Sequence, residues 1–255
     1  MSARIEDAGD RLIIWNGNTA KRGALSPELY EAINQAMEQA QEPRIRSVIL
    51  TSEGGFFCAG GNLNVLIERR QLSETQRRGK VDELHDLLRG IRACPVPVIA
   101  AVEGGAAGAG LSLALACDLI VAAKDAKFTA AYVKAGLVPD GGLTSAMARL
   151  LPRPLAMEMC LMGRPVMATR FAELGAVNRL AAPGKVMEEA MVLADHLAAG
   201  PRVAQGVIRG LVAQAYETSE ADQLDAERDA MAAAAGRDEA AEGIAAFLEK
   251  RPAVY

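Results

Sequence analysis

The chain has 255 residues, of which 51% are hydrophobic and 24% are charged, a balance that is typical of a folded globular protein. Its 28 basic and 32 acidic residues give a net charge of −4, which excludes a global positive field that would attract nucleic acid or an anionic membrane. No apolar run reaches the ~18 residues of a membrane span. Residues 1–10 lack the apolar core of a signal peptide. We therefore expect a cytoplasmic protein with no nucleic-acid or membrane partner.

The four cysteines predict no metal site. Cys58, Cys94, Cys117 and Cys160 are far apart in the sequence, with no Cys-x-x-Cys pair and no histidine close by. We expect them to be reduced residues that fill space in the core. Cys58 adjoins a candidate site described below, but no neighbour would lower the pKa of its thiol, so it is not a predicted nucleophile.

The first predicted elements are a strand, a basic turn and a capped helix. Residues 12–15 form a short apolar strand, and Lys21 and Arg22 lie in the turn behind it. Ser26 then caps a helix that has Pro27 at its first position. The two cations fit a solvated turn and a local site for an anionic group equally well.

A second apolar strand, residues 48–51, leads to the sequence Phe-Cys-Ala-Gly-Gly-Asn-Leu at residues 57–63. Residues 68–80 are rich in arginine and predict a mobile surface segment with a solvated charged face, although its arginines could also meet an anionic ligand. The next helix has leucines at helical spacing and ends before Pro95. His85 lies off that apolar face, and we assign it to the surface or to an interface.

Residues 98–118 are the most informative stretch. An apolar strand at 98–102 is followed by four glycines and then by a run of helix-forming residues at 111–116. The N–H groups at such a helix start are unpaired, and glycine lets a ligand approach them. Leu111 occupies the lysine position of a nucleotide P-loop, and Leu113 occupies the third glycine position of a dinucleotide fingerprint. An oxyanion hole remains, with a second donor from residues 57–63.

A strand at residues 119–123 precedes a turn-rich segment at residues 128–145. In this segment Asp140 lies between proline and glycine, where an aspartate is commonly a turn former or a helix cap. Past Leu150 the chain is predicted to be mainly helical, and His196 is interpreted as an ordinary helix residue. The alanine-rich C-terminal helices cannot enclose a core of their own, and they therefore predict contacts between subunits.

The two glycine-containing motifs resemble those of the crotonase superfamily, the enoyl-CoA hydratases and isomerases. Phe-Cys-Ala-Gly-Gly-Asn-Leu at residues 57–63 precedes Gly-Ala-Gly-Leu-Ser-Leu-Ala-Leu-Ala-Cys-Asp at residues 108–118, and the resemblance continues to the C-terminus. It implies an α/β fold with a crotonase-like ββα spiral core at residues 1–195. It also implies a C-terminal helical region at residues 196–255 that forms a homotrimer or a dimer of trimers and covers the site.

Carried over position by position, the resemblance implies an acyl-CoA site with no metal and with no cofactor beyond the coenzyme A of the substrate. The oxyanion donors would be the N–H groups of Gly61 and Ala109. In the family a basic residue near Lys21 or Arg22 lies by the CoA ribose and phosphates, and a lysine at the Lys250 position reaches the CoA of a neighbouring subunit. The other implied substrate-binding residues are Ala24, Ala59, Gly60, Asn62, Leu63, Gly108, Ser112, Tyr132 and Phe247.

The predicted acid–base residues differ from those of the family's hydratases. Those enzymes carry glutamates at the positions of Ser112 and Tyr132, and hydration needs one group to activate water and another to deliver a proton. Neither hydroxyl titrates near neutral pH. Asp140 matches an aspartate of another branch, which includes isomerases of the phenylacetate pathway and chlorobenzoyl-CoA dehalogenases. The predicted function is therefore double-bond isomerisation of an enoyl-CoA with Asp140 as acid and base.

Three alternatives stay open. Asp140 could activate water or attack the substrate, which would give an enoyl-CoA hydratase or a ring-cleaving or dehalogenase-like hydrolase of a CoA thioester. Residues 110–114 nearly fit the nucleophile elbow of a serine hydrolase, but Ser112 would lie inside a helix and not at a strand-end turn. The absence of both glutamates also permits an acyl-CoA-binding pseudoenzyme without catalytic activity.

Overall fold

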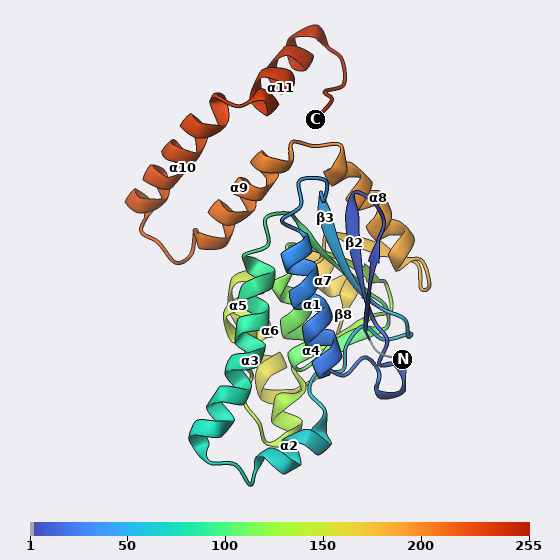
Figure 1. Cartoon of the computed structure of the whole chain (residues 1–255). Coiled ribbons are helices and arrows are strands. Elements are labelled where there is room, and N and C mark those ends of the chain that lie inside the picture. The colour runs from blue at the N-terminus through green and yellow to red at the C-terminus, as the bar shows by residue number, and fades with distance from the viewer. Residues whose placement is uncertain (1–2) are drawn as a thin grey trace.

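The computed structural model describes residues 3–255, and a mostly parallel β-sheet forms the centre of its fold (Figure 1). The six strands of this sheet are arranged in the order β1-β2-β3-β4-β6-β9. β1 pairs antiparallel with β2 at the edge, and every other pair is parallel. The strands are β1 (Arg4–Asp7), β2 (Arg11–Asn16), β3 (Ser47–Ser52), β4 (Val98–Val102), β6 (Leu119–Ala123) and β9 (Arg179–Ala181).

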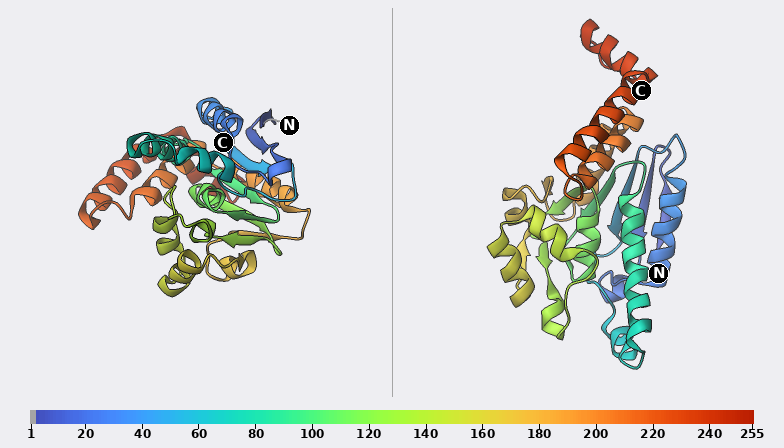
Figure 2. Two further views of the ribbon diagram at one scale, coloured as in Figure 1. Left: turned by 90° about the horizontal axis from the view of Figure 1, so that it is seen from below. Right: turned by 90° about the vertical axis from the view of Figure 1, so that its left-hand side faces the viewer.

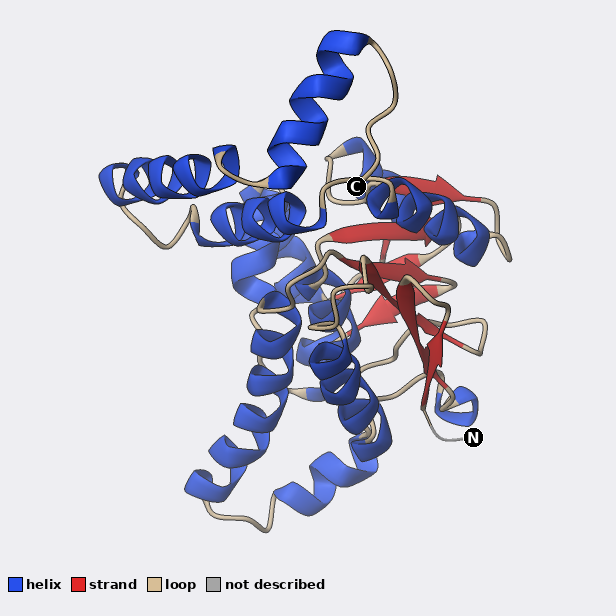
Figure 3. Cartoon of the chain, turned by 45° about the horizontal axis from the view of Figure 1, so that its top comes forward, coloured by secondary structure: helices blue, strands red, loops and turns tan. Residues whose placement is uncertain are grey.

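A second, three-stranded sheet adjoins the first and has the order β5-β7-β8. β5 directly follows β4 in the chain, so the two sheets are joined at the glycine-rich stretch. Figure 3 shows that helices reach past the strands at both ends of the molecule. The strands of this sheet are β5 (Gly105–Ala107), β7 (Lys127–Thr129) and β8 (Val166–Met167).

Helices pack against the large sheet and against one another. α1 contacts β2 and α3, whereas α8 packs across β3, β4 and β6. Past Leu150 the chain is mainly helical, as predicted, with only the short strands β8 and β9 between its helices. The helices through α8 are η1 (Thr19–Lys21), α1 (Pro27–Gln39), α2 (Leu63–Arg69), α3 (Glu74–Arg92), α4 (Ala109–Ala116), η2 (Ala131–Ala135), α5 (Leu143–Leu150), α6 (Arg153–Met162), α7 (Ala168–Glu173) and α8 (Val186–Ala198).

Local sequence signals set several of these boundaries. The Oγ of Ser26 accepts a hydrogen bond from the N–H of Leu29 over 3.3 Å, and α1 begins at Pro27 as predicted. β4 spans the predicted residues, and every one of its side chains is buried because it lies between the parallel strands β3 and β6. All eight residues of α4 are buried as well. The strand–turn–helix unit is therefore the centre of the core.

Residues 68–80, predicted as a mobile surface segment, are mostly exposed but largely helical. α2 ends at Arg69, and α3 begins after Ser73, whose Oγ accepts a hydrogen bond from the N–H of Gln76. The Gln76 side chain in turn accepts from the N–H of Ser73, which completes a capping box. This box starts a helix where the charged composition alone indicated only a surface segment.

The C-terminal helices α9 (Arg202–Gln214), α10 (Glu220–Ala235) and α11 (Asp238–Glu249) extend from the end of the molecule opposite α2 (Figures 1 and 2). α9 and α10 bury no residue fully, and α11 buries only Ala246. The predicted boundary at residues 195/196 falls near the end of α8 and stays a prediction. Within residues 3–255, no helix is both long and apolar enough to cross a membrane.

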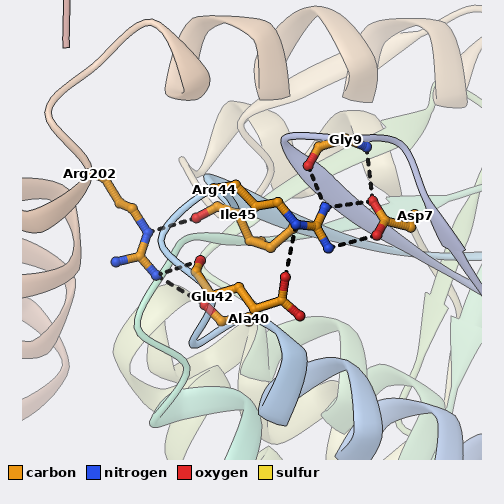
Figure 4. A network of polar contacts seen from close by, with 7 residues as sticks. All are labelled: Asp7, Gly9, Ala40, Glu42, Arg44, Ile45 and Arg202. Atoms are coloured by element: carbon orange, nitrogen blue, oxygen red, sulfur yellow. Dashed lines mark hydrogen bonds and ion pairs between the residues drawn. The ribbon is translucent and has the colours of Figure 1, made fainter.

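Arg202 fastens the start of α9 to the body of the protein. Its guanidinium donates hydrogen bonds to the carbonyl oxygens of Ala40, Glu42 and Ile45, just beyond the end of α1 (Figure 4). In the same loop the Arg44 guanidinium pairs with Asp7 at 2.7 Å. The loop after α1 is thus held from two directions.

Candidate active site

The two glycine-containing turns lie against each other. The N–H of Ala107 donates to the carbonyl oxygen of Cys58 over 2.9 Å, and a Cβ added to Gly60 would lie 3.1 Å from the nitrogen of Ala109. Ala109 is the first residue of α4, so its N–H has no partner within the helix. The main-chain turn that carries Gly61 therefore lies beside the start of α4, as the sequence motifs require for two donors that act on one oxygen.

This close approach depends on the absence of a side chain at Gly110. A Cβ at that position would lie 2.2 Å from the carbonyl oxygen of Cys58, which is far inside van der Waals contact. Gly108, which precedes α4, has a φ of 55°, a value that favours glycine. The sequence thus places glycine both where the chain turns into α4 and where α4 touches the other loop.

Ser112, Tyr132 and Asp140 form a hydrogen-bonded cluster next to the start of α4. The hydroxyl of Tyr132, in η2, donates to Oδ1 of Asp140 over 2.7 Å and lies 3.2 Å from the Oγ of Ser112. The Ser112 hydroxyl donates to the main-chain oxygen of Asp140 over 3.0 Å. A Cβ at Gly108 would lie 4.0 Å from the Tyr132 ring, so the cluster adjoins the glycine turn. The structure thus brings these three predicted site residues together.

Burial raises the pKa values of the phenols and of the thiol near this cluster. It raises the pKa of Tyr132 well above its usual value, and the neighbouring Asp140 carboxylate raises that pKa further. Tyr132 is therefore a hydrogen-bond donor at neutral pH. Tyr30 of α1, which the sequence did not single out, has its pKa raised to about 12, mainly by burial. Burial also raises the pKa of the Cys58 thiol to about 12, which agrees with its interpretation as a packing residue and not a nucleophile.

The position of His85 differs from the one expected from the sequence. It was expected at the surface or at an interface, but it is half-buried, and its Nε2 accepts a hydrogen bond from the N–H of Gly141 over 3.2 Å. Gly141 directly follows Asp140. The contact joins residues 56 positions apart in the chain, so helical spacing within α3 could not reveal it.

The basic turn lies beside the turn at residues 57–63. The N–H of Ala59 donates to the main-chain oxygen of Arg22, and the N–H of Leu25 donates to the oxygen of Gly60. The Arg22 guanidinium carbon lies 4.0 Å from the centre of the Phe56 ring, a cation–π contact. Lys21 is exposed and Ala24 is buried in the same turn. These residues therefore adjoin the predicted oxyanion donors through main-chain contacts.

The remaining predicted site residues are divided between the two ends of the chain. Asn62 caps α2 by accepting a hydrogen bond from the N–H of Asn64, and Leu63 at the start of α2 is 60% exposed. Phe247 and Lys250 lie at the end of α11, far from α2 in the same chain (Figure 1), and Phe247 is 84% exposed. In residues 3–255, no group of three His, Cys, Asp or Glu residues could hold a metal ion.

A sequence profile described as enoyl-CoA hydratase/isomerase matches residues 17–255. The chain belongs to this family. It is 34% identical to the 1,2-epoxyphenylacetyl-CoA isomerase of Escherichia coli K12 over 89% of this chain and 88% of that protein. It is 33% identical to the enoyl-CoA hydratase EchA19 of Mycobacterium tuberculosis over 98% of this chain and 94% of that protein. The crystal structure of an enoyl-CoA hydratase from Polaromonas sp. JS666 matches with a TM-score of 0.96 at 42% identity and full coverage of both chains.

Family membership confirms the predicted crotonase-type fold, and the chain is an acyl-CoA enzyme of the enoyl-CoA hydratase/isomerase family. The geometry does not support the serine-hydrolase alternative. Ser112 lies inside α4, and its hydroxyl contacts Tyr132 and the main chain of Asp140, with no histidine among its partners in residues 3–255.

Proposed function

We propose that this enzyme moves the double bond of an enoyl-CoA, with Asp140 as the acid and base. The observation that supports this proposal is the convergence of Ser112 and Tyr132 on Asp140, at 3.0 Å and 2.7 Å. Family hydratases carry glutamates at the positions of these two hydroxyl residues. In this chain both side chains instead bind the one aspartate, which leaves a single carboxylate for proton transfer.

The proposed reaction is a 1,3-proton shift. The Asp140 carboxylate takes a proton from C2 of a 3-enoyl-CoA, and the electron pair of that C–H bond moves onto the thioester to give a dienolate. The N–H groups of Gly61 and Ala109 stabilise the negative oxygen, and each such donor contributes about 3 kcal/mol to lowering the barrier. Protonated Asp140 then returns the proton to C4, which gives the 2-enoyl-CoA with no water added.

Tyr132 and Ser112 orient the base in this scheme. The phenol of Tyr132 binds Oδ1 of Asp140, so Oδ2 is left for the substrate proton. Because the pKa of Tyr132 is raised, its hydroxyl keeps its proton and acts only as a donor to the carboxylate. Ser112 fixes the main chain of the same aspartate.

The test is Asp140→Asn, which keeps the size of the side chain and removes its basicity. Turnover of a 3-enoyl-CoA should fall by about 100-fold or more, while CoA affinity stays near that of the wild type. Glu103→Gln is the matched control, because the Glu103 carboxylate accepts from the N–H of Gly184 at 3.0 Å, and among residues 3–255 no hydrogen bond joins its side chain to the cluster. Near-normal turnover of Asp140→Asn would reject the mechanism.

A second candidate is isomerisation of an epoxide on an aryl acyl-CoA. It is favoured by the 34% identity to the relative named 1,2-epoxyphenylacetyl-CoA isomerase. A substrate panel separates the candidates. A 3-enoyl-CoA tests the proposed reaction, a 2-enoyl-CoA in water tests hydration, and an aryl acyl-CoA epoxide tests the second candidate. Tight acyl-CoA binding with no turnover of any of them would favour a pseudoenzyme.

We also propose that the protein assembles as a homotrimer or a dimer of trimers. Large apolar side chains lie exposed on all three C-terminal helices, as expected where one subunit packs on another. Sedimentation velocity at micromolar concentration tests this proposal, and a stable monomer would contradict it. The exposed side chains are Val207, Ile208, Val212, Leu224, Met231, Ile244, Phe247 and Leu248.

The proposed assembly provides the cations that an acidic chain needs for CoA. Lys21 or Arg22 of one subunit and Lys250 of a neighbour would contact the ribose and phosphates. The double variant Lys21→Gln with Arg22→Gln and the single variant Lys250→Gln should each weaken CoA binding while leaving the thermal unfolding temperature near that of the wild type. Equal affinity for CoA in both variants and the wild type would reject this assignment.

A further inference from the structure

The peptide group between Asp140 and Gly141 is held at both of its polar atoms. Its oxygen accepts a hydrogen bond from the Oγ of Ser112 at 3.0 Å, and its N–H donates to the Nε2 of His85 at 3.2 Å. Ser112 comes from α4 and His85 from α3, so two helices fix one peptide plane. We infer that His85 is a positioning residue for Asp140, an inference that rests on the proposed function of that aspartate.

Close packing around Gly141 limits the movement of the turn at Asp140 and Gly141. Gly141 is buried with a φ of 60°, and a Cβ on it would lie 2.8 Å from the Cβ of Ser112 and 2.9 Å from the Cδ1 of Leu88. Leu88 follows His85 by one turn of α3. The chain therefore passes directly between the two helices, and rotation of the peptide plane is the motion that remains. Three hydrogen bonds restrict that rotation: Ser112 Oγ and the N–H of Leu143 donate to the Asp140 oxygen, the latter over 3.2 Å, and the Gly141 N–H donates to His85.

Orientation of the peptide controls where the Asp140 carboxylate points. The side chain leaves the same Cα whose carbonyl Ser112 holds, and its Oδ1 is bound by Tyr132. Without His85, the peptide keeps the hydrogen bonds from Ser112 and Leu143 to its oxygen and loses the one on its nitrogen, so it can tilt about that oxygen. Small displacements of a reacting group cost large factors in rate, because proton transfer requires close and aligned atoms.

The hydrogen bond from Gly141 also determines the tautomer of the His85 imidazole. Nε2 can accept from the Gly141 N–H only when it carries no proton, so the ring proton is on Nδ1. A glutamine side chain offers an amide oxygen at nearly the same reach as Nε2, but it cannot take up or deliver a proton. An asparagine is polar and too short to reach. Glutamine therefore separates a positioning role from direct proton transfer.

The experiment compares His85→Leu, His85→Asn and His85→Gln in the full-length enzyme. For the leucine and asparagine variants we expect kcat to fall about 10- to 100-fold with KM within about twofold of the wild type. Amide hydrogen exchange of residues 137–145 should become faster in the same two variants. His85→Gln should restore most of both properties. Asp82→Leu is the control, because Asp82 is exposed on the same helix.

Two results would overturn the inference. If His85→Gln is as slow as His85→Leu, the imidazole transfers a proton itself and is more than a positioning residue. If His85→Leu and His85→Asn leave kcat and exchange unchanged, the contact has no effect on Asp140. Should the leucine variant fail to fold, the asparagine variant alone decides. Exchange is measured without substrate, so it still tests the peptide contact if Asp140→Asn proves fully active and the proposed function fails.

Discussion

The phenolic oxygen of Tyr132 lies 2.7 Å from Oδ1 of Asp140 and 3.2 Å from the Oγ of Ser112. Tyr132 comes from η2 and Ser112 from α4, and Asp140 lies in the turn just before α5. Two elements thus contact one aspartate, Tyr132 at its carboxylate and Ser112 at its main-chain oxygen. Since this aspartate is the proposed acid and base, each hydrogen bond to it makes a testable contribution to activity and to stability.

Tyr132→Phe removes the donor to Asp140 and keeps the ring. We expect kcat to fall about tenfold, because the carboxylate loses one of its orienting contacts. The free energy of unfolding should fall by about 1.5–3 kcal/mol, the range for a hydrogen bond to a charged group. Steady-state kinetics and urea unfolding measure the two effects. Tyr216→Phe is the control, because Tyr216 is 69% exposed. Unchanged kcat in Tyr132→Phe would rule out the orienting role.

Gly110→Ala should disrupt the contact between α4 and the neighbouring turn. Its Cβ would lie 2.2 Å from the carbonyl oxygen of Cys58, so one of the two loops must move. We expect a loss of about 1–3 kcal/mol in unfolding free energy and a large loss of turnover. Gly90→Ala is the matched control in α3, where an added Cβ meets nothing within 4 Å. That variant should gain up to about 1 kcal/mol. Wild-type turnover in Gly110→Ala would contradict the predicted oxyanion site.

Arg209→Ala should destabilise the protein strongly. The Arg209 side chain is only 8% exposed, and its guanidinium pairs with Asp118 at 2.7 Å. It also donates to the carbonyl oxygens of Ile91, Arg92 and Cys94 at the end of α3. Removing it leaves these acceptors without their partner, at a cost of about 3 kcal/mol.

Arg228→Ala provides the comparison for Arg209→Ala in thermal and urea unfolding. Arg228 also pairs with two carboxylates, but its side chain is 62% exposed. Its loss should change the unfolding free energy by less than about 0.5 kcal/mol. Equal effects of the two substitutions would show that burial does not decide the strength of these pairs.

The ion pair between Glu242 and Arg251 near the C-terminus should depend on pH. The Arg251 guanidinium, and then the N–H of Val254, lower the pKa of Glu242 from 4.5 to about 2. Because the folded form has the lower pKa, the contact is fully present above pH 4.5 and is lost as the pH falls toward about 2. An NMR titration of the Glu242 carboxyl should show this low midpoint, and Arg251→Gln should raise it. A midpoint that Arg251→Gln leaves unchanged would contradict this account.

The elements with strong local signals could be predicted from the sequence. The Ser26 cap fixed the start of α1, and the apolar run at residues 98–102 became β4. β1 (Arg4–Asp7) was missed because it is a mostly exposed edge strand with a single apolar residue, and β5 was missed because it lies inside a glycine-rich stretch. Such strands have weak local sequence signals, because they form by pairing with a neighbouring strand.

The parts of the candidate site that consist of main-chain motifs could be predicted from the sequence. The contacts made by side chains from distant parts of the chain could not. Residues 57–63 and 108–118 carry their own turn and helix signals, and the structure places them in contact. His85 has no such signal, because its partner Gly141 comes near only after α3 has packed against the turn before α5.

The close fit between Ser112 and Gly141 restricts how this enzyme could change its reaction. A hydratase-like variant would need a carboxylate at position 112, where the Oγ of Ser112 already lies 3.0 Å from the main-chain oxygen of Asp140. From the direction that the serine side chain takes, a longer side chain meets the Asp140 turn. A glutamate at position 112 would therefore have to take another rotamer or displace the Asp140 turn, and displacement of the turn would move the proposed base.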